Sequence, residues 1–88
     1  MNKETIWKDV SFIISSEYRK KVLEKLETPK TPSNLSKEIN INISHVSRAL
    51  SELESKKMIE CLTPESNKGK LYIITKYGKD VLNKVEGI

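Results

Sequence analysis

Cysteine is almost absent from this sequence, and its scarcity limits the chemistry that the chain can perform. The one cysteine, Cys61, cannot form an internal disulfide bond, and with a single histidine elsewhere it offers no set of metal ligands. We therefore expect no metal site and no other cofactor. Because free cysteines are usually buried, we interpret Cys61 as an inert, buried thiol on a strand.

Glycine and long apolar runs are scarce as well. The three glycines form no phosphate-binding loop, and neither paired carboxylates on a common face nor a His, Cys and Asp cluster indicates an active site. The longest apolar run, Leu71–Ile74, has four residues and is too short to cross a membrane. The amino-terminal residues lack the apolar core of a signal peptide. We expect a protein that is not an enzyme, does not enter a membrane and works in the cytoplasm.

Acidic residues are missing from one stretch, residues 66–79, which contains four lysines. Those lysines account for the whole net charge of +4, because the rest of the chain carries 12 Lys and Arg and 12 Asp and Glu. A positive charge concentrated in this way indicates a nucleic-acid partner. With 36% hydrophobic and 32% charged residues, the composition otherwise predicts one small globular domain over residues 1–88.

The first part of the chain has the apolar periodicity of helices. Apolar residues three or four positions apart predict helices over residues 4–14 and 17–26. Ser15–Ser16 either break these helices or lie within one continuous helix, and both alternatives stay open. We place Trp7 in the core because of its large apolar area, and Tyr18 between the central helices.

A helix-turn-helix follows. Two prolines exclude a helix over residues 28–31, whereas Thr31 followed by proline is a typical start for a short helix over residues 32–39. Asn40–Asn42 then make a tight turn into a helix over residues 44–57.

The helix over residues 44–57 has two contrasting faces. Val46, Leu50 and Leu53 form one apolar stripe at helical spacing. Small hydroxyl side chains, which permit close approach, surround one arginine on the opposite face, and arginine can pair with a guanine edge or a phosphate. This helix alone is equally compatible with a DNA-binding face and an ordinary solvated one. The polar face contains Ser44, Arg48, Ser51 and Ser55, flanked by His45, Ser47 and Glu52.

A hairpin and a last helix complete the chain. Residues 59–63 and 70–75 are predicted strands, joined by a loop over residues 64–69, and Thr75 caps a helix over residues 76–85. The predicted fold is therefore mainly α with a small β-hairpin, in the order α-α-α-α-β-β-α. This order is the winged helix-turn-helix arrangement.

The sequence also resembles a known family. From about residue 7 to residue 82, and most specifically in SHVSRALSELE, ECLTPE and GKLYIITKYGK, it is similar to archaeal winged-helix transcription regulators of the ArsR/MarR-like group. The resemblance implies sequence-specific binding of double-stranded DNA. Helix 44–57 would read the major groove, and wing 64–70 would contact the backbone or minor groove. The residues implied are Ser44, His45, Ser47, Arg48 and Ser51 in the groove, Asn67, Lys68 and Lys70 on the wing, and Thr31 and Ser33 at a phosphate.

The sequence departs from the family pattern at three points. The paired cysteines of metal-sensing members are absent, so we expect no metal sensing. Lys57 replaces the glycine that follows the recognition helix, and it must be left-handed if the turn geometry is kept. We also expect no added ligand-binding or long dimerisation segment, and we name no effector.

Less specific interpretations compete with DNA binding. In these, Lys68 and Lys70 are edge lysines that prevent aggregation, and Arg48 and His45 are ordinary surface residues. A winged helix can also act as a protein–protein interaction module within a transcription or other nucleic-acid assembly. Such modules often lose the basic wing and carry an apolar recognition face. This chain has the wing lysines and lacks the apolar face, which favours DNA binding.

The terminal helices carry more apolar side chains than a short domain readily covers. An exposed stripe of this size usually marks an interface, and a two-fold pair reads two DNA half-sites. We therefore expect a homodimer with contacts at residues 1–14 and 76–88. In the alternative, the first helix folds back over the last and covers both stripes within one chain. The stripes consist of Ile6, Trp7, Val10, Ile13, Ile14, Val81, Leu82, Val85 and Ile88.

Overall fold

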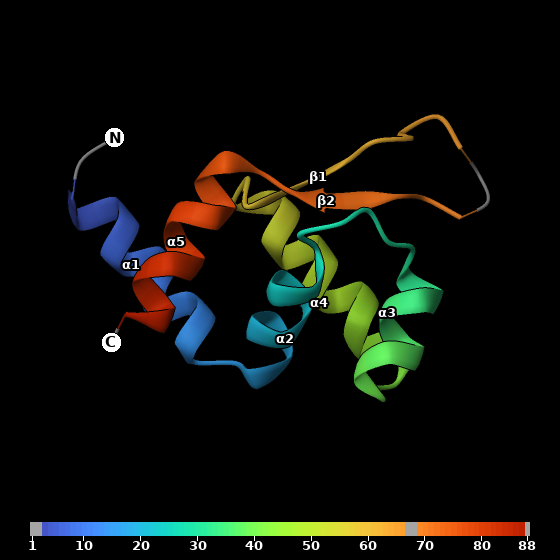
Figure 1. The fold of residues 1–88 in the computed structure, drawn as a ribbon, viewed down its shortest axis with the longest axis horizontal. Coiled ribbons are helices and arrows are strands. Elements are labelled where there is room, and N and C mark those ends of the chain that lie inside the picture. Colours follow the sequence, from blue (N-terminus) through green and yellow to red (C-terminus); the bar gives the residue numbers. More distant parts are fainter. Residues whose placement is uncertain (1–2, 67–68, 88) are drawn as a thin grey trace.

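The computed structural model describes residues 3–66 and 69–87. Within them the elements follow the predicted order (Figure 1). They are α1 (Lys3–Ile14), α2 (Glu17–Lys25), α3 (Pro32–Ile39), α4 (Ile43–Ser55), β1 (Ile59–Cys61), β2 (Tyr72–Ile74) and α5 (Lys76–Glu86). The mainly α winged helix-turn-helix fold with one antiparallel hairpin is therefore confirmed. None of the described helices has the length and apolar character needed to cross a membrane.

A break at Ser15–Ser16 separates α1 from α2. Ser16 is extended (φ −139°, ψ 117°), and its Oγ accepts a hydrogen bond of 3.4 Å from the backbone N–H of Arg19. The Ser15 hydroxyl donates to the carbonyl of Phe12 at 2.9 Å, at the end of α1. Side chains thus satisfy backbone groups on both sides of the break, and the alternative of one continuous helix is excluded.

The turn between α3 and α4 is built from asparagines and a capping threonine. Thr31 Oγ1 accepts a 3.2 Å hydrogen bond from the N–H of Asn34, which starts α3 as predicted. Asn40 then takes a left-handed conformation (φ 54°), which asparagine tolerates better than most residues. Asn42 Oδ1 accepts a 2.9 Å hydrogen bond from the N–H of Ser44 and starts α4.

The predicted helix covers residues 44–57, whereas α4 starts one residue earlier, at Ile43, and ends at Ser55, before Lys57. Lys57 is left-handed (φ 61°). The N–H of Met58 donates to the Leu53 carbonyl at 3.1 Å, and the N–H of Lys57 donates to the carbonyl of residue 54 at 3.0 Å. This pair of bonds is the Schellman motif, and Met58 packs in the core with Leu53. Lys57 therefore occupies a position at which glycine would be unstrained.

Lys57→Gly is expected to raise the free energy of unfolding by up to ~1 kcal/mol, since glycine is left-handed without a Cβ clash. Urea denaturation measures the change. Lys57→Ala keeps the Cβ and should bring no such gain. A lower stability for the glycine variant would show that the Lys57 side chain contributes more than its backbone conformation costs.

The hairpin is shorter than the predicted strands of residues 59–63 and 70–75. Beyond the regular ladder, the N–H of Leu71 donates to Thr63 Oγ1 at 3.0 Å, so that a side chain replaces the backbone acceptor. Cys61, expected to be buried, is only partly buried on this narrow sheet. The paired residues are Ile59 with Ile74, Glu60 with Ile73, and Cys61 with Tyr72.

Lys30 attaches the α2–α3 connection to the hairpin. Its backbone N–H and carbonyl exchange hydrogen bonds of 3.0 and 2.9 Å with Tyr72, so β2 lies between Lys30 and β1. The Lys30 ammonium lies 3.0 Å from the Glu38 carboxylate on α3. The wing is therefore anchored to the helix-turn-helix at its base.

All five described helices and both strands contribute to the hydrophobic core. Two aromatic predictions were wrong, because Trp7 and Tyr18 are 49% and 42% exposed. Both rings lie at the edge of a helix's apolar side. The Trp7 ring lies 5.5 Å from the Lys84 ammonium, and the Tyr18 ring lies beside His45. The buried apolar residues are Val10, Ile13, Val22, Leu23, Leu26, Leu35, Val46, Ala49, Leu50, Leu53, Met58, Ile59, Ile74, Val81, Leu82 and Val85.

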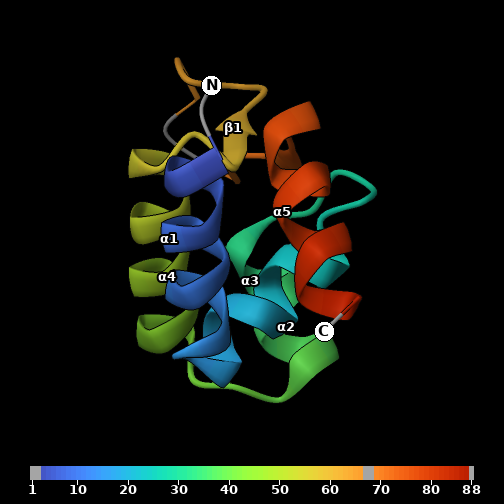
Figure 2. The ribbon, with the colours of Figure 1, turned by 90° about the vertical axis from the view of Figure 1, so that its left-hand side faces the viewer.

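The terminal helices α1 and α5 pack against each other within one chain (Figures 1 and 2). Their apolar stripes bury Val10 and Ile13 from α1, and Val81, Leu82 and Val85 from α5. The first helix thus folds back over the last, as in the alternative to the dimer. Trp7 and Ile14, which is 53% exposed, remain on the surface of α1.

A polar cluster around the buried Asp9 fixes α1 in place. Asp9 is 7% exposed and accepts a hydrogen bond from the hydroxyl of Tyr77 on α5. Lys56, at the end of α4, places its ammonium 3.9 Å from the same carboxylate. Burial, together with the bond to Asp9, raises the pKa of Tyr77 to about 12. The protonated tyrosine therefore acts as a lasting donor that joins α5 to α1.

Candidate nucleic-acid interface

The outer face of α4 is exposed along its length, and in Figure 2 this helix forms one edge of the molecule. All five residues that the sequence assigns to a groove lie on it, namely Ser44, His45, Ser47, Arg48 and Ser51. The opposite side of the helix is buried in the core, through Val46, Ala49, Leu50 and Leu53. The prediction of one buried and one exposed polar face is therefore confirmed.

These side chains differ in their availability to a partner. The Ser44 hydroxyl donates to Asn42 Oδ1 at 2.8 Å, so it is engaged in the helix cap. The side chains of Ser47, Arg48 and Ser51 make no hydrogen bond or ion pair with other described residues. A guanidinium between two small hydroxyl groups is thus free to contact another molecule.

A shallow groove of about 370 Å³ runs between α2 and this face. At one end the rings of Tyr18 and His45 lie with centroids 5.1 Å apart. Arg48 and Glu52 line the same groove from α4. Tyr18 and Arg19 come from a helix some 30 residues away, and no pattern within α4 signals their presence.

Glu52 is the acidic group of the groove, and Arg19 neutralises it. The Arg19 Nη2 lies 2.7 Å from Glu52 Oε2. The hydrogen bond from Arg19 lowers the pKa of Glu52 below its ordinary value against the opposing effect of burial, and the charges of Arg19 and Arg48 lower it further. Glu52 is therefore a carboxylate at neutral pH, adjacent to the free guanidinium of Arg48.

The start of α3 offers two more predicted residues. Thr31 is partly buried, and its Oγ1 already accepts the capping bond from Asn34. Ser33 is exposed in the first turn of α3. The amino terminus of a helix carries partial positive charge and unpaired N–H groups, which suit a phosphate.

The wing extends away from the helices at the end of the molecule opposite α1 (Figure 1). Lys70 is exposed, and Gly69 beside it takes the left-handed conformation (φ 62°) that the loop requires. Asn67 and Lys68, the other predicted wing residues, lie outside the described residues. Two further lysines of the acid-free stretch, Lys76 and Lys79, lie on α5.

Comparison with family models decides the classification, because the model of the winged helix-turn-helix family matches residues 15–88. The chain belongs to the winged helix-turn-helix family. The matched range begins at the break before α2 and includes every element of the candidate interface. A search of curated proteins finds no match.

Solved structures of MarR from E. coli and of ZitR from Lactococcus lactis share the winged helix-turn-helix fold of this chain. Wild-type MarR from E. coli in its apo form has a TM-score of 0.76 at 22% identity, covering 96% of this chain and 64% of MarR. A MarR mutant from E. coli complexed with operator DNA has a TM-score of 0.74 at 23% identity, covering 96% of this chain and 62% of the mutant. A ZitR mutant from Lactococcus lactis has a TM-score of 0.71 at 18% identity, covering 82% of this chain and 51% of ZitR. The chain thus spans about half to two-thirds of the length of these proteins.

Proposed function

We propose that this winged helix-turn-helix protein binds double-stranded DNA sequence-specifically and regulates transcription. α4 reads the major groove, while the wing over residues 64–70 contacts the backbone or minor groove. Thr31 and Ser33 at the start of α3 meet a phosphate. On the sequence resemblance we also assign the chain to the archaeal ArsR/MarR-like regulators, and we propose that it works in the cytoplasm.

The observation that carries this proposal is the free Arg48 guanidinium on α4. Its neighbours Ser47 and Ser51 are small, so a base edge can approach the helix closely. The MarR mutant of similar fold was crystallised with operator DNA, which supports the same class of partner for this chain. The net charge of +4 favours association with the phosphate backbone.

Selection of bound sequences from random duplex DNA tests the proposal. We expect a short motif to be enriched, and to bind at least 10³-fold more tightly than random duplex, about the lower end for specific binders. Enrichment of no motif by a protein that still binds random duplex would leave only non-specific binding. The operator, the regulated genes and the direction of regulation would follow from the motif.

Lys70→Ala is expected to weaken binding to all duplexes alike and to reduce the slope of log affinity against log salt by about one. The reason is that a phosphate contact releases one condensed counterion without reading a base. Fluorescence anisotropy at several salt concentrations measures the slope. Lys21→Ala removes the same charge from α2, where its ion-pair partner is Glu17 on the same helix, and should leave the slope unchanged. If both variants behave alike, Lys70 protects the hairpin edge instead.

We further propose that the protein acts as a homodimer through its terminal helices. Because α1 covers most of the α5 stripe, Trp7 and Ile14 are the exposed apolar groups that the described part of the two stripes leaves for a second copy. Ile88, also assigned to the stripes, lies outside the described residues. Val85 is buried in the single chain and is unsuitable for an interface test.

Light scattering at micromolar concentration should therefore give twice the 10.1 kDa of one chain. Trp7→Glu should give a folded monomer that binds a half-site weakly, because it places a charge in the proposed interface. Thr28→Glu, at an exposed position between α2 and α3 and outside the terminal helices, is the control for added charge. A wild-type mass of one chain that persists on a palindromic duplex would contradict the dimer.

A further inference from the structure

Glu52 lies in a position to interfere with DNA binding. It occupies the edge of the polar face of α4, four residues after Arg48, and side chains at this spacing are neighbours on a helix. A free carboxylate here would have two unfavourable effects. It would repel the phosphates of an approaching duplex, and it would attract the guanidinium of Arg48 into an ion pair within the helix.

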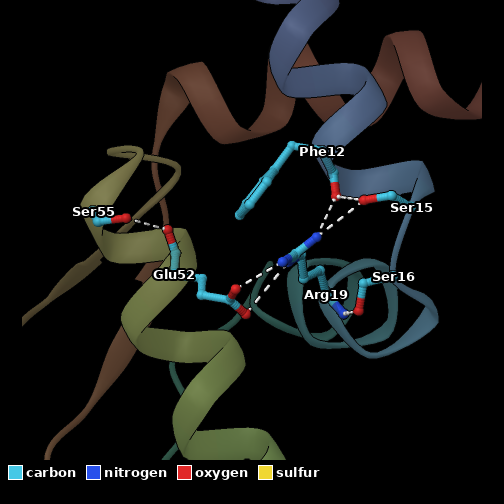
Figure 3. Close-up of polar contacts among 6 residues, drawn as sticks. All are labelled: Phe12, Ser15, Ser16, Arg19, Glu52 and Ser55. Carbon is cyan, nitrogen blue, oxygen red and sulfur yellow. Dashed lines mark hydrogen bonds and ion pairs between the residues drawn. The ribbon is translucent and has the colours of Figure 1, made fainter.

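Arg19 prevents both effects through a network that crosses three helices (Figure 3). Its Nη2 donates to Glu52 Oε2 at 2.7 Å, and its Nε donates to Oε1 at 3.4 Å, so both carboxylate oxygens are engaged. The Nη2 bond is short and charge-assisted, while the longer Nε bond adds the second contact that fixes the orientation of the carboxylate. Glu52 is thereby held towards α2.

Arg19 is itself fixed by the junction of α1 and α2. Its Nη1 donates to the Phe12 carbonyl and to Ser15 Oγ, both at 3.0 Å. The guanidinium carbon lies 3.8 Å from the centroid of the Phe12 ring, a stacked cation–π contact. The Arg19 side chain is 18% exposed, compared with 35% for Glu52. Figure 3 shows the guanidinium enclosed by Phe12, Ser15 and Glu52. A cation held by this many contacts is preorganised and does not have to be recruited when DNA binds.

We propose that Arg19 is a positioning residue for DNA recognition, because it holds the Glu52 carboxylate and so leaves the Arg48 guanidinium free for the duplex. This inference rests on the proposed function, with Arg48 as the base-reading residue. It adds a residue of α2, outside the helix-turn-helix, that acts on DNA only through Glu52. It also connects the α1–α2 junction to recognition, since a movement of Phe12 or Ser15 would loosen Arg19.

Arg19→Gln tests the proposal without removing the whole side chain. We expect affinity for the selected duplex to fall about three- to ten-fold, because Glu52 is released to pair with Arg48 and to repel phosphate. The double variant Arg19→Gln with Glu52→Gln should recover the affinity of the wild type, since the competing carboxylate is gone. Glu52→Gln alone should bind as tightly as the wild type or more tightly. Lys21→Gln is the matched control, because it removes an equal charge from α2 while its ion-pair partner is Glu17 on the same helix.

The possible outcomes distinguish a failure of the inference about Arg19 from a failure of the proposed DNA binding. If the double variant stays as weak as Arg19→Gln, Arg19 acts directly or only on stability, and the inference is overturned. A loss of affinity in Glu52→Gln alone would also overturn it, because Glu52 would then contact a base. If the wild type binds no duplex, the proposed function itself fails.

A measurement without DNA tests whether Arg19 keeps Glu52 and Arg48 apart. NMR titration of Glu52 should show a pKa that responds more to Arg48→Gln in the Arg19→Gln background than in the wild type. An equal response in both backgrounds would show that Arg19 does not keep the two α4 side chains apart.

Discussion

Gly78→Ala is expected to lower the free energy of unfolding by at least ~3 kcal/mol, the upper end of the usual cost of overpacking. A Cβ at this position of α5 would lie 2.1 Å from the carbonyl oxygen of Met58 and 2.7 Å from the Ile74 side chain. The first contact is with backbone that cannot turn aside, so α5 or the base of the hairpin must shift.

Urea denaturation of the alanine variants measures this effect. Gly87→Ala is the control, because a Cβ there would meet its nearest atom at 3.3 Å and the backbone has an ordinary helical conformation (φ −83°). We expect a change within about 0.5 kcal/mol for Gly87→Ala. Similar losses for the two variants would show that α5 does not approach the hairpin as closely as the structure shows.

Arg48→Ala is expected to cost ~1–3 kcal/mol of binding free energy on the selected site and almost nothing on random duplex, as for a lost two-pronged base contact. The side chain is free in the structure, so its removal should leave stability nearly unchanged. Competition binding against the two duplexes gives both values. Arg48→Lys is a sharper variant, because lysine keeps the charge without the planar fork and should lose most of the specificity. An equal loss on both duplexes would make Arg48 a phosphate contact.

The fold was predictable where local chemistry determines it. Thr31 and Thr75 start their helices through bonds to the N–H three residues later, at 3.2 and 3.0 Å, as their positions in the sequence predict. The two faces of α4 also follow from spacing alone. The left-handed backbone of Lys57 was predicted in a different way, from the glycine that the resembling family has at this position and on the condition that the turn geometry is kept.

What the sequence did not predict depends on contacts between distant residues. Periodicity identifies the apolar side of a helix but not how far a neighbour covers it, so Trp7 and Tyr18 were wrongly placed in the core. Arg19 and Glu52 are 33 residues apart, and each reads as an ordinary surface charge until α2 lies beside α4. The requirement for Gly78 likewise arises only from the packing of α5 on Met58.

The salt dependence of binding to random-sequence duplex tests DNA binding most directly, because it requires no knowledge of the operator. We expect affinity to fall about 10²–10³-fold between roughly 50 and 200 mM salt, as for about four to six phosphate contacts. Fluorescence anisotropy with a labelled duplex provides the measurement. The absence of binding at the lowest salt, or an affinity independent of salt, would contradict DNA binding and favour a protein–protein interaction module.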